Sequence, residues 1–190
     1  EPLFRSQFTG ARELVSSGRG INGAPAFSPD GERIAYIGSV NINDPSEGRL
    51  YMVPSSGGER RELVPEYLGH VGNFIWSDDD SVRWLGSRGV YSEWATASLY
   101  EPQSPGTAPK PGPIIRTVHG NPGQDVVAAI ADTPQHPAEL YLLRDGAVPL
   151  RLTNSNPFLG ERELAKQEAM TYKARDGLEL EAILIHPLTK

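Results

Sequence analysis

The chain has 190 residues and a formal net charge of −6, with 38% hydrophobic and 22% charged residues. This hydrophobic content allows a packed core and argues against a chain that is disordered throughout. The basic residues are scattered and their longest run is Arg60-Arg61, so neither nucleic acid nor an anionic membrane surface is expected as a partner.

No cysteine is present, which excludes disulfides, a thiolate nucleophile and cysteine-ligated zinc. We expect a soluble protein of the cytoplasm or the periplasm, and the sequence does not decide between them. No apolar run is long enough to form a transmembrane helix. The 20 glycines and 17 prolines predict many short elements joined by tight turns, which favours an all-β fold.

Three kinds of segment recur along the chain in a constant order. The first is an apolar strand, a polar turn and a second apolar strand, with turns beginning at Ser28, Ser77 and Ala131, at intervals of roughly 50 residues. The turn Ser28-Pro29-Asp30-Gly31 has suitable chemistry, because proline presets φ, aspartate bonds its own backbone and glycine accepts a positive φ. The flanking strands are rich in Ile, Val, Tyr and Trp, which suit a half-buried pleated sheet.

The other two recurring segments are short strands. One is marked by Leu-Tyr, and it occurs at Leu50-Tyr51, Leu99-Tyr100 and Leu140-Tyr141. The other has the form Arg-x-Leu followed by Val, or Arg-Leu-Thr, and it occurs at 12–15, 61–64 and 151–153. Ile114 to Val118 is interpreted as its equivalent in the remaining unit.

Each unit is therefore predicted to be a four-stranded antiparallel meander. Repeats of about 40–50 residues with four strands each are typical of β-propellers, in which every blade covers its neighbour. The predicted fold is all-β, a partial β-propeller of about three blades, which is too few to close a ring of about four to eight. The expected units are the last strand of a preceding blade at about 1–20 and blades at 21–69, 70–120 and 121–153. The polar loop at 39–48 and the proline-rich segment at 101–113 are interpreted as surface connections.

The repeat pattern ends after Thr153. Asn156-Pro157 predicts a helix cap with proline at the first helical position, within a linker at 154–169. Residues 170–190 predict a β-hairpin around Arg175-Asp176-Gly177. Its second strand alternates leucine and alanine with glutamate, which indicates one buried face.

The tail also resembles a known family. Leu152-Thr153-Asn154, followed by Asn156-Pro157 and by Thr171-Tyr172-Lys173-Ala174-Arg175-Asp176-Gly177, is similar to the junction between the propeller and the hydrolase domain in the prolyl oligopeptidase family of serine peptidases. The acylaminoacyl-peptidase branch is the most similar. The blades resemble that family's propeller too, but TolB-like propellers share their turns and Leu-Tyr strands. The tail is therefore the part that distinguishes the peptidase family from TolB-like propellers.

The resemblance implies that the hairpin at 170–190 begins an α/β-hydrolase domain and that the polypeptide continues past Lys190. In the family the propeller restricts entry, so that short peptides are cut and folded proteins are excluded. Catalysis uses Ser, Asp and His, with the serine on a Gly-x-Ser-x-Gly elbow. No such elbow occurs here, so no catalytic residue is assigned and the 190-residue chain alone is expected to be inactive.

No metal site or cofactor is assigned either. The four histidines form no metal-binding pair, and each is interpreted as a turn or surface residue: His70, His119, His136 and His186. Asp78-Asp79-Asp80 lacks the spacing of a calcium loop and aligns with the first turn, which favours a solvated turn. Trp76 and Trp84 align with Phe27 and Tyr36, which favours core packing. Trp94 has no equivalent, so it and the 101–113 segment are left as possible substrate contacts.

Two functional hypotheses follow. The first is the non-catalytic, substrate-gating propeller portion of a serine peptidase, whose partners are the hydrolase domain of the same polypeptide and short peptides or acyl-peptides. The second is a TolB-like or WD-type propeller that acts as a protein-interaction module. A propeller glycosidase would need two close carboxylates, and the sequence gives no reason to favour it. In either case a partial ring exposes apolar faces and strand edges, so self-association of this chain is expected.

Overall fold

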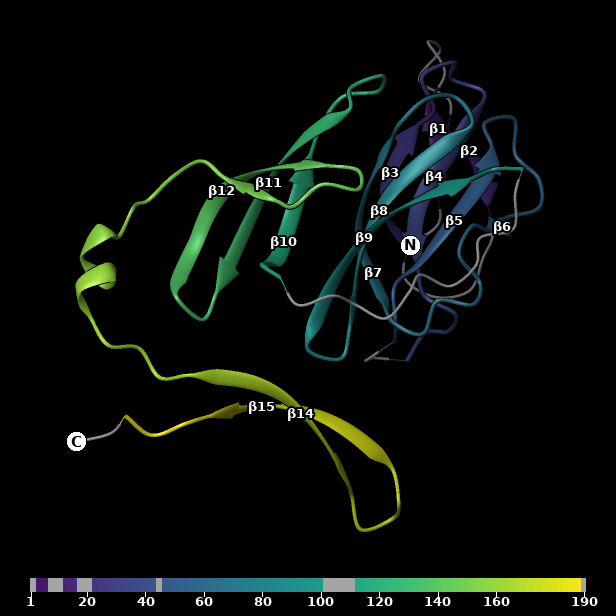
Figure 1. Ribbon diagram of the computed structural model, residues 1–190. Coiled ribbons are helices and arrows are strands. Elements are labelled where there is room, and N and C mark those ends of the chain that lie inside the picture. Colours follow the sequence, from purple (N-terminus) through teal and green to yellow (C-terminus); the bar gives the residue numbers. More distant parts are fainter. Residues whose placement is uncertain (1–2, 7–11, 17–21, 44–45, 101–111, 189–190) are drawn as a thin grey trace.

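The computed structural model describes residues 3–6, 12–16, 22–43, 46–100 and 112–188. Its regular elements are antiparallel strands with one short 3-10 turn, which confirms the all-β prediction (Figure 1). No helix in these residues is long and apolar enough to cross a membrane. The strands form successive sheets, and each sheet is a meander in which neighbours along the chain pair.

The sheets follow one another in chain order. The first consists of β1 (Leu3–Ser6) and β2 (Arg12–Ser16). The second consists of β3 (Asn22–Phe27), β4 (Arg33–Gly38), β5 (Arg49–Pro54) and β6 (Arg61–Glu62). The third consists of β7 (His70–Trp76), β8 (Ser81–Arg88) and β9 (Tyr91–Ser98). The fourth consists of β10 (Ile114–His119), β11 (Val126–Thr133), β12 (His136–Arg144) and β13 (Leu150–Arg151).

The tail has its own structure. A 3-10 turn, η1 (Pro157–Glu161), begins with the proline as predicted, although the Asn156 side chain makes no capping hydrogen bond. The hairpin of β14 (Gln167–Lys173) and β15 (Glu179–Ile185) begins three residues before the predicted boundary at 170. It lies apart from the stacked sheets at the end of an extended linker (Figure 1).

The prediction for residues 114–118 is wrong. β10 pairs with β11 and is the first strand of the fourth sheet, not the last strand of the third. The first turn of the fourth sheet therefore lies between His119 and Val126, not at Ala131. Its Gly123 has a φ of 75°, close to the 76° of Gly31 in the second sheet's first turn. The third sheet has three strands among the described residues, since the chain after β9 enters the segment 101–111, which lies outside them.

Apolar side chains fill the spaces between neighbouring sheets. One cluster joins the β3–β6 sheet to the β7–β9 sheet and includes Leu50, Val71, Trp76, Val82 and Trp84, all of them buried. A second cluster joins the β7–β9 sheet to the β10–β13 sheet and includes Leu85, Val118, Val127, Tyr141 and Leu143. The core-packing prediction for Trp76 and Trp84 is thereby confirmed.

Polar contacts tie the first turns of the sheets together. Trp76 Nε1 donates to the Ala26 carbonyl at 3.0 Å, and the Asp30 amide donates to Asp79 Oδ1 at 2.9 Å. In the next pair of sheets the Gly123 amide donates to the Ser77 carbonyl at 2.6 Å. Asp79 lies in an exposed turn, as predicted for Asp78-Asp79-Asp80, and this turn serves as a contact between sheets.

A β-bulge interrupts the first strand of the second, third and fourth sheets. The pairing of β3 with β4 shifts between Gly23 and Ala26, that of β7 with β8 shifts at Gly72, and that of β10 with β11 shifts at Arg116. β3, β7 and β10 contact one another from sheet to sheet. The bulges therefore form a row at the opposite end of these strands from the first turns.

One face of the fourth sheet has no covering sheet in the described chain. Cross-strand pairs place five apolar side chains on it: Ala128, Ile130, Leu140, Leu142 and Leu150. None of them belongs to the buried clusters, and Leu140 and Leu150 are exposed. Like the faces that neighbouring sheets cover elsewhere in the stack, this face is apolar.

Replacing Trp76 with alanine should destabilise the chain by about 3–5 kcal/mol, because its side chain fills the space between two sheets. Phe27 holds the matching position, since Phe27 pairs with Ile34 as Trp76 pairs with Val82, yet it is 56% exposed. Phe27→Ala should therefore cost less than about 1 kcal/mol. Urea unfolding followed by circular dichroism measures both. Equal losses in the two variants would contradict this assignment of the core.

Candidate functional site: a cavity between the sheets and the hairpin

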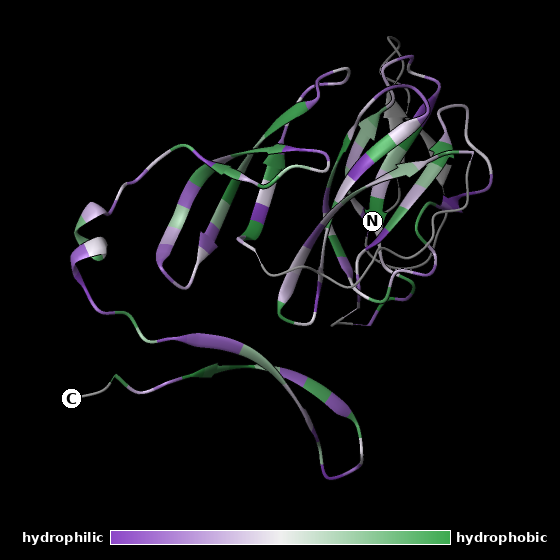
Figure 2. Ribbon diagram, viewed as in Figure 1, coloured by the Kyte–Doolittle hydropathy of each residue, from purple (hydrophilic) through white to green (hydrophobic). Residues whose placement is uncertain are grey.

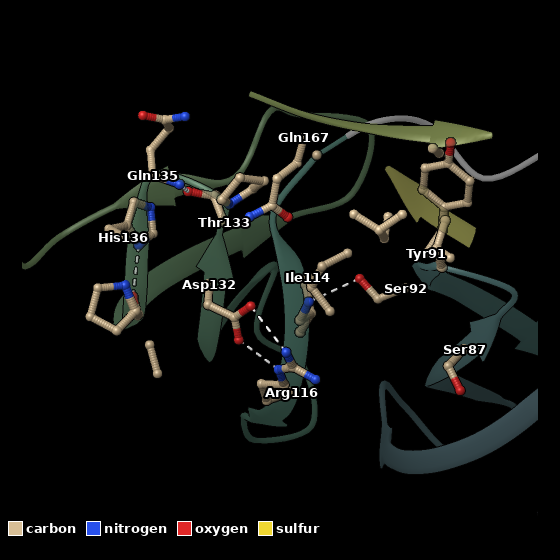
Figure 3. A pocket seen from close by; sticks show the side chains of 18 of the residues that line it. Ser87, Tyr91, Ser92, Ile114, Arg116, Asp132, Thr133, Gln135, His136 and Gln167 are labelled. Carbon is tan, nitrogen blue, oxygen red and sulfur yellow. Dashed lines mark hydrogen bonds and ion pairs between the residues drawn. The ribbon is translucent and has the colours of Figure 1, made fainter. Parts of the chain in front are cut away.

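A cavity with a volume of about 1500 Å³ lies among the described residues. It lies at the bulge end of β7 and β10 and extends to the linker and the hairpin (Figure 3). Gly72 and Arg116, the two bulge residues, both line it. Six residues of the linker and the hairpin form the opposite wall: Leu159, Leu164, Gln167, Glu168, Ala169 and Ile183.

An ion pair marks the wall of the cavity formed by β10 and β11. Arg116 Nε donates to Asp132 Oδ2 at 2.6 Å and Arg116 Nη2 donates to Asp132 Oδ1 at 3.0 Å, a bidentate pair that Figure 3 shows across the two strands. The hydrogen bond that Arg116 donates to Asp132 raises the pKa of Arg116, which stays protonated. The Arg116 side chain is 60% exposed although both partners lie in strands.

Ser92 joins the third and fourth sheets at the same cavity. Its Oγ accepts a hydrogen bond from the Ile115 amide at 2.9 Å and donates to the Pro113 carbonyl at 3.3 Å. This contact fixes the start of β10 against β9. It also satisfies backbone groups beside the bulge, where the regular ladder is interrupted.

The hairpin reaches the third sheet through one charged side chain. The Val90 amide, in the turn between β8 and β9, donates to Glu181 Oε2 at 3.1 Å. Gly89 in this turn has a φ of 58°, and a Cβ at that position would lie 1.7 Å from the same oxygen. Glycine is thus favoured here both by the backbone conformation and by the close approach of the carboxylate.

The linker begins at a buried carboxylate. Glu139 in β12 is 2% exposed and accepts hydrogen bonds from Thr153 Oγ1, from the Ser155 amide at 2.7 Å and from Ser155 Oγ at 3.0 Å. Arg151 Nη2 lies 3.4 Å from its Oε1. The hydrogen bond from Thr153, with those from Ser155 and the charge of Arg151, lowers the pKa of Glu139 to about 2. The ionised side chain therefore holds residues 151–155 against β12, where the chain leaves the last sheet.

Sequence reasoning missed the residues that matter most here. Arg116, Asp132 and Glu139 carry no local motif, and their roles depend on strand pairing that the sequence does not display. Glu139 had one signal, the polar run 153–155, of which Thr153 and Asn154 belong to the stretch that resembles the family junction. Its hydroxyls and amide supply the donors that the buried carboxylate needs.

Trp94, predicted as a possible substrate contact, does not line the cavity. It packs instead against the apolar cluster between the third and fourth sheets. Of the proline-rich segment, residues 101–111 lie outside the described chain, and Gly112 lines the cavity. His70 and His136 line it as well.

The four histidines lie apart, and within the described ranges no group of three or more His, Asp or Glu side chains is arranged to hold a metal ion. His70 Nδ1 accepts from the Gly48 amide at 2.9 Å, and His136 Nε2 lies 2.8 Å from the Tyr141 hydroxyl. His186 lies 3.2 Å from Glu168. The ring nitrogens of His70, His136 and His186 thus contact other groups of this chain.

No protein-family model and no curated protein matches the sequence. Solved structures do match. Acylaminoacyl peptidase from Pyrococcus horikoshii superposes with a TM-score of 0.67 over 96% of this chain at 19% identity. A putative TolB from Agrobacterium tumefaciens superposes with a TM-score of 0.62 over 81% of the chain at 20% identity. The β-propeller domain of the trilobed protease from Pyrococcus furiosus gives 0.54 over 77% at 20% identity.

The chain has the fold of a partial β-propeller. The predicted resemblance to peptidase and TolB propellers is thus confirmed at the level of fold, and the stacked sheets are the blades. This propeller segment spans 27% of the acylaminoacyl peptidase, 55% of the TolB chain and 42% of the trilobed-protease domain.

Replacing Glu139 with glutamine should remove a pH-dependent part of the stability. Because the pKa of Glu139 is lower in the fold than its ordinary value of 4.5, its ionised form stabilises the fold above pH 4.5, and this contribution is lost as the pH falls toward 2. We expect Glu139→Gln to unfold more easily than the wild type at neutral pH, and the difference to shrink over that acidic window. Urea unfolding at a series of pH values measures it.

Glu179→Gln is the matched control, since Glu179 lies exposed on the hairpin. A difference between wild type and Glu139→Gln that stays constant from neutral to acidic pH would contradict the role of the buried carboxylate. So would an equal loss of stability in Glu179→Gln.

Proposed function

We propose that this propeller segment is the non-catalytic, substrate-gating part of a serine peptidase of the prolyl oligopeptidase family. In this proposal the blades are residues 1–153, the linker runs from residue 154 to the start of the hairpin at Gln167, and the hairpin begins an α/β-hydrolase domain of the same polypeptide. That domain supplies the catalytic residues, and the substrates are short peptides or acyl-peptides. The cavity between the blades and the hairpin is where such a peptide meets the propeller.

The observation that carries the proposal is the hairpin β14–β15. It follows the last blade but does not stack on it as a further blade, and most of its side chains are exposed. Hydrophobic and hydrophilic residues alternate in the first half of β15 before the strand becomes apolar (Figure 2), and Met170, Tyr172 and Ile183 are exposed. A two-stranded sheet is marginally stable alone, so this hairpin needs a partner sheet or domain. The superposition on acylaminoacyl peptidase over 96% of the chain supports a hydrolase domain as that partner.

The alternative is a TolB-like interaction propeller without an enzyme domain. The superpositions on TolB structures favour it, because the putative TolB of Agrobacterium tumefaciens matches with a TM-score of 0.62. In that case the cavity would bind a protein partner, and the hairpin would pack on that partner or on another part of the same chain.

The two candidates are separated by labelling the natural protein with a fluorophosphonate, which reacts with the nucleophile of serine hydrolases. An antibody against residues 112–188 identifies the protein in an extract. We expect a band several times larger than this chain that carries the label, with none after heat denaturation. An unlabelled band would reject the peptidase and favour the interaction propeller.

We also propose that the 190-residue chain associates with itself, because the fourth sheet leaves an apolar face uncovered. Leu150 lies on this face and is 59% exposed. Leu150→Lys should shift the chain from oligomers toward monomers in light scattering. Val148→Lys is the matched control, because Val148 is 89% exposed but lies in the turn before β13. A wild-type chain that stays monomeric at high concentration would contradict this proposal.

A further inference from the structure

The row of bulges gives the cavity its one guanidinium group. A bulge places an extra residue on one strand, and this commonly redirects a side chain beside a functional site. The extra residues are small or apolar in β3, where Ala24 and Pro25 lie between the shifted pairs, and in β7, where Gly72 does. In β10 the extra residue is Arg116. Among the described residues that line the cavity, there is no lysine and no other arginine.

Asp132 holds Arg116 in place but does not take up all of the hydrogen-bond donors of its guanidinium. Its Nε and Nη2 donate to Asp132, which fixes the plane of the guanidinium. Nη1 has no hydrogen-bond partner within the described chain, and Nη2 has a second hydrogen. A guanidinium has five N–H donors, and Nη1 and Nη2 can still donate together to a carboxylate in a bidentate arrangement.

The surroundings leave room for such a group. The Arg116 side chain is 60% exposed while Asp132 is 23% exposed, so the arginine projects further from the sheet than its partner. Gly72, the bulge residue of the neighbouring blade, has no side chain to fill the space on that side. Figure 3 shows Thr133 and Gln135 beyond Asp132, where they add polar groups to the lining of the cavity.

We propose that Arg116 is a substrate-binding residue that receives a carboxylate group of a short peptide in this cavity, with Asp132 as its positioning residue. This rests on the proposed function in that the cavity admits peptides. The carboxylate comes either from the C-terminus of the peptide or from an acidic side chain. Both sources present the same group, a carboxylate, and the experiment below distinguishes between them.

The test measures equilibrium binding to the full polypeptide that contains this segment, after treatment with a fluorophosphonate to stop hydrolysis. Three dansylated tetrapeptides serve as probes: tetra-alanine with a free C-terminus, the same peptide as a C-terminal amide, and an amide with one internal glutamate. Fluorescence anisotropy gives the three dissociation constants. Loss of a charge-assisted bidentate contact typically weakens binding by roughly tenfold or more.

If the C-terminus is the ligand, the free acid binds roughly tenfold more tightly than the plain amide. If an acidic side chain is the ligand, the glutamate amide shows that advantage instead. In either case Arg116→Gln abolishes the advantage. Arg144→Gln, which changes an exposed arginine outside the cavity, keeps the advantage.

The double variant Arg116→Gln/Asp132→Asn guards against an unfolding effect, because it leaves no unpaired carboxylate at the wall. It should melt at the wild-type temperature and still lack the advantage. Equal affinity of the wild type for all three peptides, binding of none of them, or an advantage that survives in the double variant overturns the proposal. Because binding is measured without catalysis, a protein that fails to label but still discriminates the peptides rejects the peptidase and leaves the carboxylate site standing.

Discussion

The fold depends on covering the apolar faces of its sheets. A short meander such as β3–β6 has apolar side chains on both sides and no closed core of its own, so each face has to be buried by a neighbouring sheet. The clusters around Trp84 and around Val127 are these interfaces, and they connect residues from strands far apart in the sequence. Stacking is therefore the source of stability, and the shape of the cavity follows from it.

The two ends of the first strands have different roles. At the turn end, polar contacts such as that between Asp30 and Asp79 lock successive blades in register. At the other end, bulges interrupt the ladder, and the cavity opens where Gly72 and Arg116 lie. The regular end fixes the position of the strands, and the irregular end is free to differ from blade to blade. A repeated fold can thus place one charged group at a single site without disturbing the packing between its blades.

The sequence predicted what is local and repeated. The turn at Ser28-Pro29-Asp30-Gly31 follows from local turn chemistry, and the core positions of Trp76 and Trp84 follow from the repeat; both were assigned correctly. Residues 114–118 were misassigned because a short β-branched run does not indicate on which side its partner lies, and because the proline-rich segment before it interrupts the period. The Arg116–Asp132 pair was missed because a one-residue bulge in strand pairing leaves no mark in the sequence.

The propeller and the hairpin are joined by a different kind of contact from that within the propeller. Blades meet through buried aromatic and aliphatic side chains, whereas the hairpin meets the third blade through Glu181 and the Val90 amide, an exposed hydrogen bond. Exposed polar contacts contribute little net free energy, because water replaces them when they break. The linker between them buries no side chain in its 3-10 turn, so its fixed point is the buried Glu139 at the last blade. The cavity is thus bounded on one side by a rigid apolar stack and on the other by a hairpin attached through polar groups, and the second side is the one that can be displaced at low energetic cost.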